Sequence, residues 1–287
     1  EPLRTTTYFM DSAVPKVSRI IMNLNMRRLK LEKSAVMISL DCDTDKDSDA
    51  VEEVVESLLK LELNPALAVP AETILRNKGT YKRLAERNIE FLNHGYRMHT
   101  FQDLKSKTFI NVDIYRDLTK EEIEEDIRRA HQVIEKLLGQ CAIGFRTPHF
   151  GNMQNKGDLR RIHDILKANN YEYSSSTGPH HLLGPRTLRG GKVTELPVTG
   201  GYERPFRVFD TWSYFEANLN GGNKDNYVQN LKKLIDGARK RPTLINIYMD
   251  PRHLVECKDV YTAFKNLNME HFIFPRFSDF VRGSIWK

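Results

Sequence analysis

Short apolar segments alternate with segments of helical periodicity along most of this 287-residue chain, and this alternation strongly constrains its fold. Strand-length apolar runs occur at 35–40, 65–69, 89–92, 142–145, 171–174, 194–198, 243–249 and 271–274. Apolar residues recur at helical spacing in the segments 51–61, 71–88, 119–137, 157–168, 225–238 and 257–266. Repeated strand–loop–helix units are typical of a parallel barrel or a doubly wound sheet.

The first 33 residues do not follow this pattern. Apolar residues at Val17, Ile20, Ile21 and Leu24 are followed by a basic run, which predicts a short helix packed on the main domain. We therefore expect an N-terminal helical extension at 1–33 and one α/β domain at 34–287. An α/β barrel of this size is routinely a single domain, although about 150 residues per domain is usual.

Composition excludes several classes of protein. With 40% hydrophobic and 29% charged residues, the chain is typical of a soluble globular protein. No run reaches the roughly 18 apolar residues of a membrane span. The net charge is +6, but no basic block indicates a nucleic-acid partner. Three widely spaced cysteines without a CxxC pair, and no visible signal peptide, predict a reducing, cytoplasmic location. The oligomeric state is left open.

Unusual polar residues gather where the predicted strands end. The pairs are Asp41 and Asp43, His94 and His99, Arg146 and His149, and Asp250 and His253. In parallel α/β folds the carboxyl ends of the strands open on one face, where sites are built. We therefore expect these side chains to lie on a common rim.

Asp41 and Asp43 are two residues apart, so on an extended chain they point to the same side. Two adjacent carboxylates repel unless a cation or an arginine lies between them. The alternative interpretation is a polar loop that caps the next helix. Arg146, just before Thr147-Pro148, could orient a neighbouring aspartate or be an ordinary surface arginine.

His94 and His99 flank Gly95-Tyr96 beside this acid-rich strand end. One carboxylate and two neutral imidazoles form a metal-ligand set that leaves an open position. Residues five apart on a regular helix point about 140° apart. Both rings can reach one ion only if the segment is a loop, or a helix with a π-bulge.

The order of these motifs resembles the polysaccharide deacetylase family, also known as the NodB-homology domain or carbohydrate esterase family 4. The resemblance covers about residues 35–280. It is carried by SLDCD at 39–43, NHGYRMH at 93–99, FRTPHFG at 145–151, YSSS at 173–176, TELPV at 194–198, DTW at 210–212 and the late apolar strand.

The resemblance implies a distorted (β/α) barrel of about seven parallel strands that holds a divalent metal, commonly zinc. Carried over residue by residue, the metal ligands are Asp43, His94 and His99, and Asp41 is the catalytic base. Arg146 orients this base, and Trp212 lines the sugar site or the hydrophobic wall beside the general acid.

Two positions depart from the family pattern. The histidine ligands are five residues apart, whereas the family usually spaces them four apart. The family's general acid is a histidine that often precedes a proline, but here Asp250 precedes Pro251. His253 is the predicted replacement, with His149 as an alternative, and we expect His149 and Asp250 to contact the substrate.

These features together predict a metal-dependent hydrolase that removes an N-acetyl group from an amino sugar or glycan. Amide hydrolysis at a metal needs a base for the attacking water and a proton donor for the leaving amine. One alternative is another amide hydrolase on the same scaffold, acting on a cyclic amide or a formyl group. A second alternative is a catalytically silent, carbohydrate-binding relative.

Overall fold

The computed structural model describes residues 29–102, 109–112, 114–149, 153–179, 185–187, 192–217 and 223–283, with a few single positions between 13 and 24. Most of the predicted N-terminal helical extension therefore lies outside the described residues. Within the described part, no helix is long and apolar enough to cross a membrane. Cys42, Cys141 and Cys257 are free thiols.

Seven parallel strands form a curled sheet in the order β10-β1-β2-β3-β6-β7-β9. Their bounds are β1 Ser34–Asp41, β2 Pro65–Val69, β3 Glu90–Asn93, β6 Gly144–Phe145, β7 Tyr173–Ser174, β9 Thr194–Glu195 and β10 Leu244–Met249. Strand β8 (Arg186–Thr187) adds to β9 in the antiparallel sense, and β11 (Phe272–Ile273) pairs with β1. The predicted distorted barrel is confirmed.

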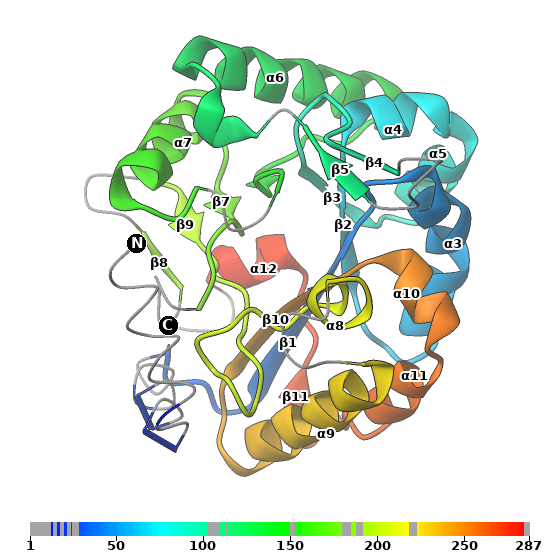
Figure 1. Ribbon diagram of the computed structural model, residues 1–287, viewed down its shortest axis with the longest axis vertical. Helices are drawn as coiled ribbons and strands as arrows, with labels where there is room; N and C mark the ends of the chain where they lie inside the picture. Colours follow the sequence, from blue (N-terminus) through cyan, green and yellow to red (C-terminus); the bar gives the residue numbers. More distant parts are fainter. Residues whose placement is uncertain are drawn as a thin grey trace.

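Helices form the outer ring around these strands (Figure 1). They are α3 Asp45–Leu59, α4 Ala71–Arg76, α5 Lys78–Glu86, α6 Lys120–Val133, α7 Lys156–Ala168, α9 Lys224–Lys240 and α11 Asp259–Phe264. The Thr119–Glu122 capping box starts α6, which continues as a π-helical segment, η3 (Ile134–Leu138), up to Gly139. Each of these helices overlaps a segment whose apolar spacing predicts a helix, although α3 begins six residues before the predicted segment 51–61.

The sheet buries both of its faces. Every residue of β1 is buried, as expected for a central strand covered by helices on one side and by the barrel interior on the other. The interior holds a second apolar cluster that includes Met37, Tyr173, Phe277 and Phe280. The last two belong to α12 (Phe277–Val281), which lies inside the ring of helices in Figure 1.

The two ends of the curled sheet meet around Asn246, through both its backbone and its side chain. Thr199 donates its backbone N–H to the Asn246 carbonyl at 2.7 Å. The Asn246 side-chain amide donates to the carbonyls of Leu196 and Pro197, each at 3.1 Å. Strands β9 and β10 are not paired in the described sheet. These buried polar contacts join β10 to the segment after β9 instead.

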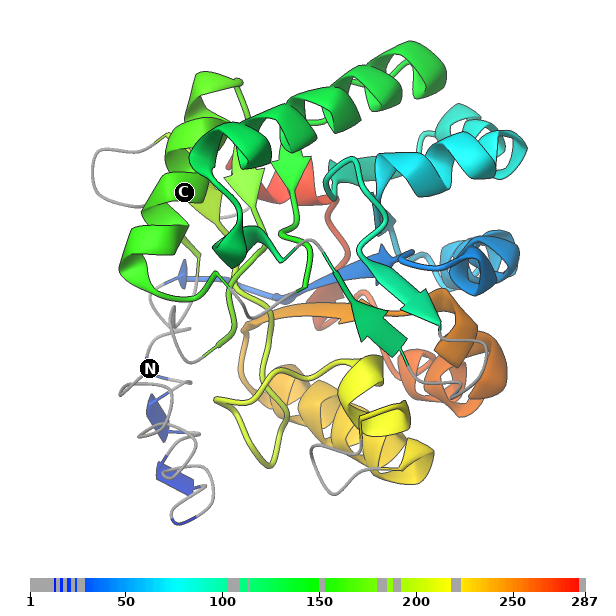
Figure 2. The ribbon, with the colours of Figure 1, turned by 45° about the horizontal axis from the view of Figure 1, so that its top comes forward.

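Three elements near the strand ends are not predicted from the sequence. They are an antiparallel hairpin of β4 (Thr100–Gln102) and β5 (Phe109–Asn111), and the short helices α8 (Thr211–Phe215) and α10 (Pro251–Glu256). Each is too short to show a clear period. In Figure 2 the hairpin and α8 lie on the same side of the barrel, and Phe109 contacts Trp212 edge to face at 5.0 Å between ring centroids.

Candidate active site

The end of β1 delivers Asp41 and Asp43 to the rim of the barrel. Helix α3 is capped by Thr44, whose side chain accepts from the Asp47 N–H while Asp47 accepts from the Thr44 N–H. The capping role that the sequence left open for the two aspartates therefore falls to Thr44. Asp41 is buried, and the side chain of Asp43 is 25% exposed.

The segment that carries His94 and His99 is a loop, which resolves the five-residue spacing. Gly95 has a φ of 78°, and a Cβ there would lie 2.6 Å from Asp126 Oδ2. The backbone N–H groups of Tyr96 and Arg97 donate to the Asp126 carboxylate. Asp126 on α6 therefore holds the turn that brings both imidazoles to one side.

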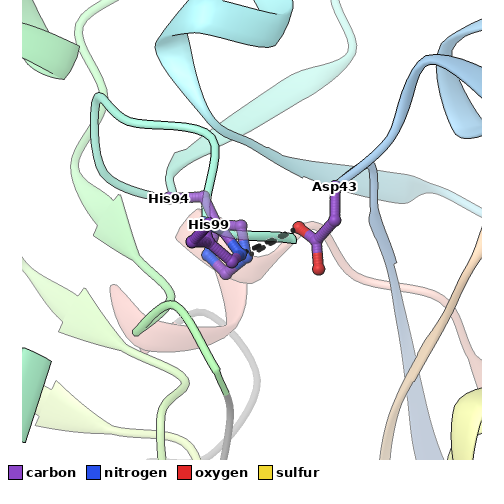
Figure 3. Close-up of side chains that lie close together, drawn as sticks. All are labelled: Asp43, His94 and His99. Carbon is purple, nitrogen blue, oxygen red and sulfur yellow. Dashed lines mark ion pairs between the residues drawn. The ribbon is translucent and has the colours of Figure 1, made fainter. Parts of the chain in front are cut away.

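Asp43, His94 and His99 converge on one point (Figure 3). Asp43 Oδ1 lies 3.2 Å from Nε2 of each histidine, and the three candidate ligand atoms are all within 4.8 Å of one another. Within the described part of the chain, Asp43 Oδ1 and His99 Nε2 are buried without a hydrogen bond. His94 Nδ1 contacts the Arg146 carbonyl at 2.8 Å, which orients the ring with Nε2 toward Asp43. This donor set fits a divalent cation.

Arg146 lies fully buried beside Asp41. Its Nη1 is 3.3 and 3.2 Å from the two carboxylate oxygens, and its Nη2 donates to the hydroxyls of Ser39 and Ser175. Burial raises the pKa of Asp41 to about 6, although the cations of Arg146 and His94 act in the opposite direction. The arginine therefore contacts the aspartate that it was predicted to orient, and the alternative of a surface arginine is wrong.

A cavity of about 150 Å³ adjoins these groups. Its described lining consists of Asp41, Asp43, His94, Thr100, Asn111, His149, Trp212, Tyr248 and Asp250. The three residues predicted to contact substrate are therefore all in its wall. His149 Nε2 lies 2.6 Å from the Val112 carbonyl, so its ring is fixed on the β5 side.

His253 does not line the cavity, in contrast to the prediction that it serves as the general acid there. It is buried on α10 behind Asp250, with Nδ1 3.0 Å from Asp250 Oδ2 and Nε2 3.1 Å from Glu216 Oε1. The physical reason is helical: Pro251 begins α10, and residues three apart lie one above the other on the same helix face, so His253 stacks behind the Asp250 carboxylate instead of reaching the cavity.

The wall also contains Thr100, Asn111 and Tyr248, which the sequence did not indicate. Tyr248 is two residues before Asp250 on the same strand end, so strand alternation could have identified it. Thr100 and Asn111 come from the hairpin, whose short strands carry no comparable signal.

A larger cavity of about 480 Å³ lies at the seam of the barrel, the junction where β10 meets the segment 196–199 after β9. It is lined in part by Pro197, Thr199 and Leu244. Among the described residues that line it, the charged ones are Lys16, Lys240 and Arg241, with neither a carboxylate nor a histidine. Size alone would favour this cavity, but the candidate metal ligands Asp43 and His94, together with Asp41, border the smaller one.

Comparison with known structures identifies the same fold in several proteins. A Mycobacterium smegmatis protein described as a polysaccharide deacetylase has 14% identity and a TM-score of 0.67, over 87% of this chain and 89% of its own. The PuuE allantoinase has 13% identity and a TM-score of 0.64, over 86% and 89%. A carbohydrate esterase family 4 pseudoenzyme from Bacillus anthracis has 12% identity and a TM-score of 0.52, over 87% and 66%.

Sequence comparison identifies the family directly. No curated protein matches the chain significantly. The family model for polysaccharide deacetylase matches residues 29–172, half of the chain, and this range includes Asp41, Asp43, both histidines of the loop and Arg146. The chain therefore belongs to the polysaccharide deacetylase family.

Proposed function

We propose that this protein is a metal-dependent hydrolase that removes an N-acetyl group from an amino sugar or glycan. The observation that carries the proposal is the set formed by Asp43, His94 and His99, whose ligand atoms converge beside the cavity that Asp41 lines. Two of these atoms, Asp43 Oδ1 and His99 Nε2, are buried and have no hydrogen bond among the residues that the structure describes, which is unusual for polar atoms unless a further group binds them.

A divalent ion held by these three residues, with zinc the expected one, would supply Lewis-acid activation of the acyl carbonyl and of the attacking water. Asp41 is the base that takes a proton from this water. Arg146 keeps the Asp41 carboxylate oriented through contacts to both oxygens. Buried beside Ser39 and Ser175, the guanidinium has little freedom to move.

The cavity wall supports an acylated sugar as substrate. Its volume of about 150 Å³ has room for an acyl group but not for a glycan, so the sugar would lie at the mouth. The indole of Trp212, packed against Phe109, offers an apolar surface for a sugar ring there. His149 and Asp250 supply polar groups on the wall for its hydroxyl or amide groups.

Acetate release from N-acetylglucosamine oligomers, measured with metal-free and zinc-loaded protein, tests the proposal. We expect Asp43→Ala to lose zinc and activity together. Asp41→Asn should retain zinc but lose activity by about 100-fold or more, because it cannot take a proton. Asp45→Asn, a change at an exposed neighbour, is the matched control and should leave both unchanged. Acetate release that survives full metal removal would contradict the proposal.

Two alternatives have specific observations in their favour. The fold is shared with an allantoinase, which favours hydrolysis of a different amide by the same groups. It is also shared with a pseudoenzyme, and Asp250 stands where the family pattern has a histidine, which favours a silent carbohydrate-binding protein. Turnover of a cyclic amide but not of acetylated sugars would support the first. Zinc binding without any amide hydrolysis would support the second.

A further inference from the structure

Asp250 occupies a position from which it can reach a substrate. It follows β10 directly, lines the cavity together with Asp41 and Asp43, and is nearly fully buried. Although it is the N-cap residue of α10, its side chain makes no capping hydrogen bond. Asp250 Oδ2 has no hydrogen bond of good geometry within the described structure. The carboxyl group is therefore not required to start the helix.

Two further ionisable side chains, His253 and Glu216, connect Asp250 to the protein surface. His253 Nδ1 lies 3.0 Å from Asp250 Oδ2, and His253 Nε2 lies 3.1 Å from Glu216 Oε1. The imidazole is 2% exposed, whereas the side chain of Glu216, at the end of α8, is 35% exposed. Each ring nitrogen thus faces a different carboxylate, one at the cavity and one at the solvent.

The charges around His253 favour its holding a proton. Burial alone would lower the pKa of His253, but the adjacent carboxylates of Asp250 and Glu216 raise it above the ordinary value. The guanidinium of Arg252 lowers the pKa of His253. Its shortest contact is a 2.6 Å pair with Asp47 of α3, and it also lies 3.6 Å from Asp250 Oδ2 and 3.7 Å from Glu216 Oε1. Asp210, which starts α8, is a further buried carboxyl group whose electrostatic interaction reaches His253.

Building on the proposed function, we propose that Asp250 passes a proton to the leaving nitrogen and that His253 and Glu216 form the relay that supplies it. In the resting state one transferable proton lies on His253 Nδ1 next to the Asp250 carboxylate, while the Nε2 hydrogen faces Glu216. His253 Nδ1 gives its proton to Asp250, and as the amide C–N bond breaks the leaving nitrogen takes this proton from Asp250. After the products leave, Asp250 takes a proton from water and returns it to His253 Nδ1. Asp41 releases to solvent the proton that it took from the attacking water, so the cycle closes.

Comparing two substrates tests this assignment. A sugar N-acetyl amide needs a proton on its leaving group, whereas 4-nitrophenyl acetate does not, because nitrophenolate leaves unaided. With zinc-loaded protein, we expect Asp250→Asn to lower kcat for the amide by about 100-fold or more. Its kcat for the ester and its zinc content should stay near the wild-type values, which also reports correct folding.

The relay has its own readout, the pH profile. In His253→Gln no imidazole holds a proton next to Asp250, so the falling alkaline limb of kcat for the amide should move to lower pH by one unit or more, with the ester profile unchanged. Glu270→Gln, which removes one exposed carboxylate elsewhere on the surface, is the control and should behave as wild type.

Three results would overturn the assignment. Full amide activity in Asp250→Asn would remove Asp250 as donor and leave the proposed function intact. Equal loss of amide and ester activity would assign Asp250 to binding or folding. A wild-type protein that binds zinc but cleaves neither substrate would contradict the proposed function, and the relay with it.

Discussion

At the residue scale, the carboxyl groups near the cavity differ in the groups that they contact. Asp41 faces the guanidinium of Arg146, and Asp43 faces two imidazoles. Asp210 is buried like Asp41, but its hydrogen bonds come from the backbone N–H and hydroxyl of Ser213, each at 2.7 Å. Burial raises the pKa of Asp210 to about 7, more than these hydrogen bonds lower it. Asp210 is thus a buried acid that becomes charged near neutral pH.

This position predicts a pH-dependent stability. Between about pH 4 and 7 the folded protein keeps a proton on Asp210 that the unfolded chain releases, so the stability contributed by this group falls as pH rises. In the wild-type protein this loss of stability is at most about 1.4 kcal/mol per pH unit. In Asp210→Asn it should be absent. Urea unfolding at pH 5 and pH 7.5 measures it, with exposed Asp225→Asn as control. The same pH slope in Asp210→Asn and wild type would contradict the assignment.

The sequence predicted which residues at the ends of strands lie at the site better than it predicted those carried by short helices. Asp43, His94 and Arg146 stand directly after buried apolar runs, so their common rim followed from parallel topology. Glu216 reaches the site at the end of a five-residue helix, α8, with no periodicity to reveal it. His253 was identified by residue type, but its orientation depends on α10, which began at a proline in a segment that looked like a loop.

At the element scale, the long helices and central strands followed from apolar periodicity, because each buries a broad face against the sheet. The loop at 94–99 did not, since its shape depends on a distant helix. Asp126 on α6 accepts from Tyr96 N–H, Arg97 N–H and the Tyr115 hydroxyl. No local pattern in the loop contains that information.

We expect Asp126→Asn to weaken zinc binding by about 10- to 100-fold, although Asp126 is not a ligand. The amide has one acceptor oxygen where the carboxylate has two, so one N–H of the loop would face an NH₂ group. Competition with a chromogenic chelator measures the affinity. Asp164→Asn, on the exposed side of α7, is the control. If both variants bind zinc as tightly as wild type, the loop does not depend on Asp126.

At the scale of the whole molecule, the curled sheet brings the site together, since β1 and β3 supply the candidate ligands and β10 supplies Asp250. The curl is completed at the seam, where Asn246 donates to the carbonyls of Leu196 and Pro197 and to the Ser175 hydroxyl. Ser175 also contacts Arg146, so the seam is linked to the group that orients Asp41.

Asn246→Leu should therefore destabilise the protein by about 2 kcal/mol or more, because two buried carbonyls lose their donor at nearly constant side-chain volume. Removal of the Asn246 Oδ1 atom, which accepts no hydrogen bond within the described structure, offsets part of this cost. Urea unfolding measures the change, and Asn266→Leu, at an exposed position, should stay within about 0.5 kcal/mol of wild type. Equal midpoints for the two variants would show that backbone contacts alone close the barrel.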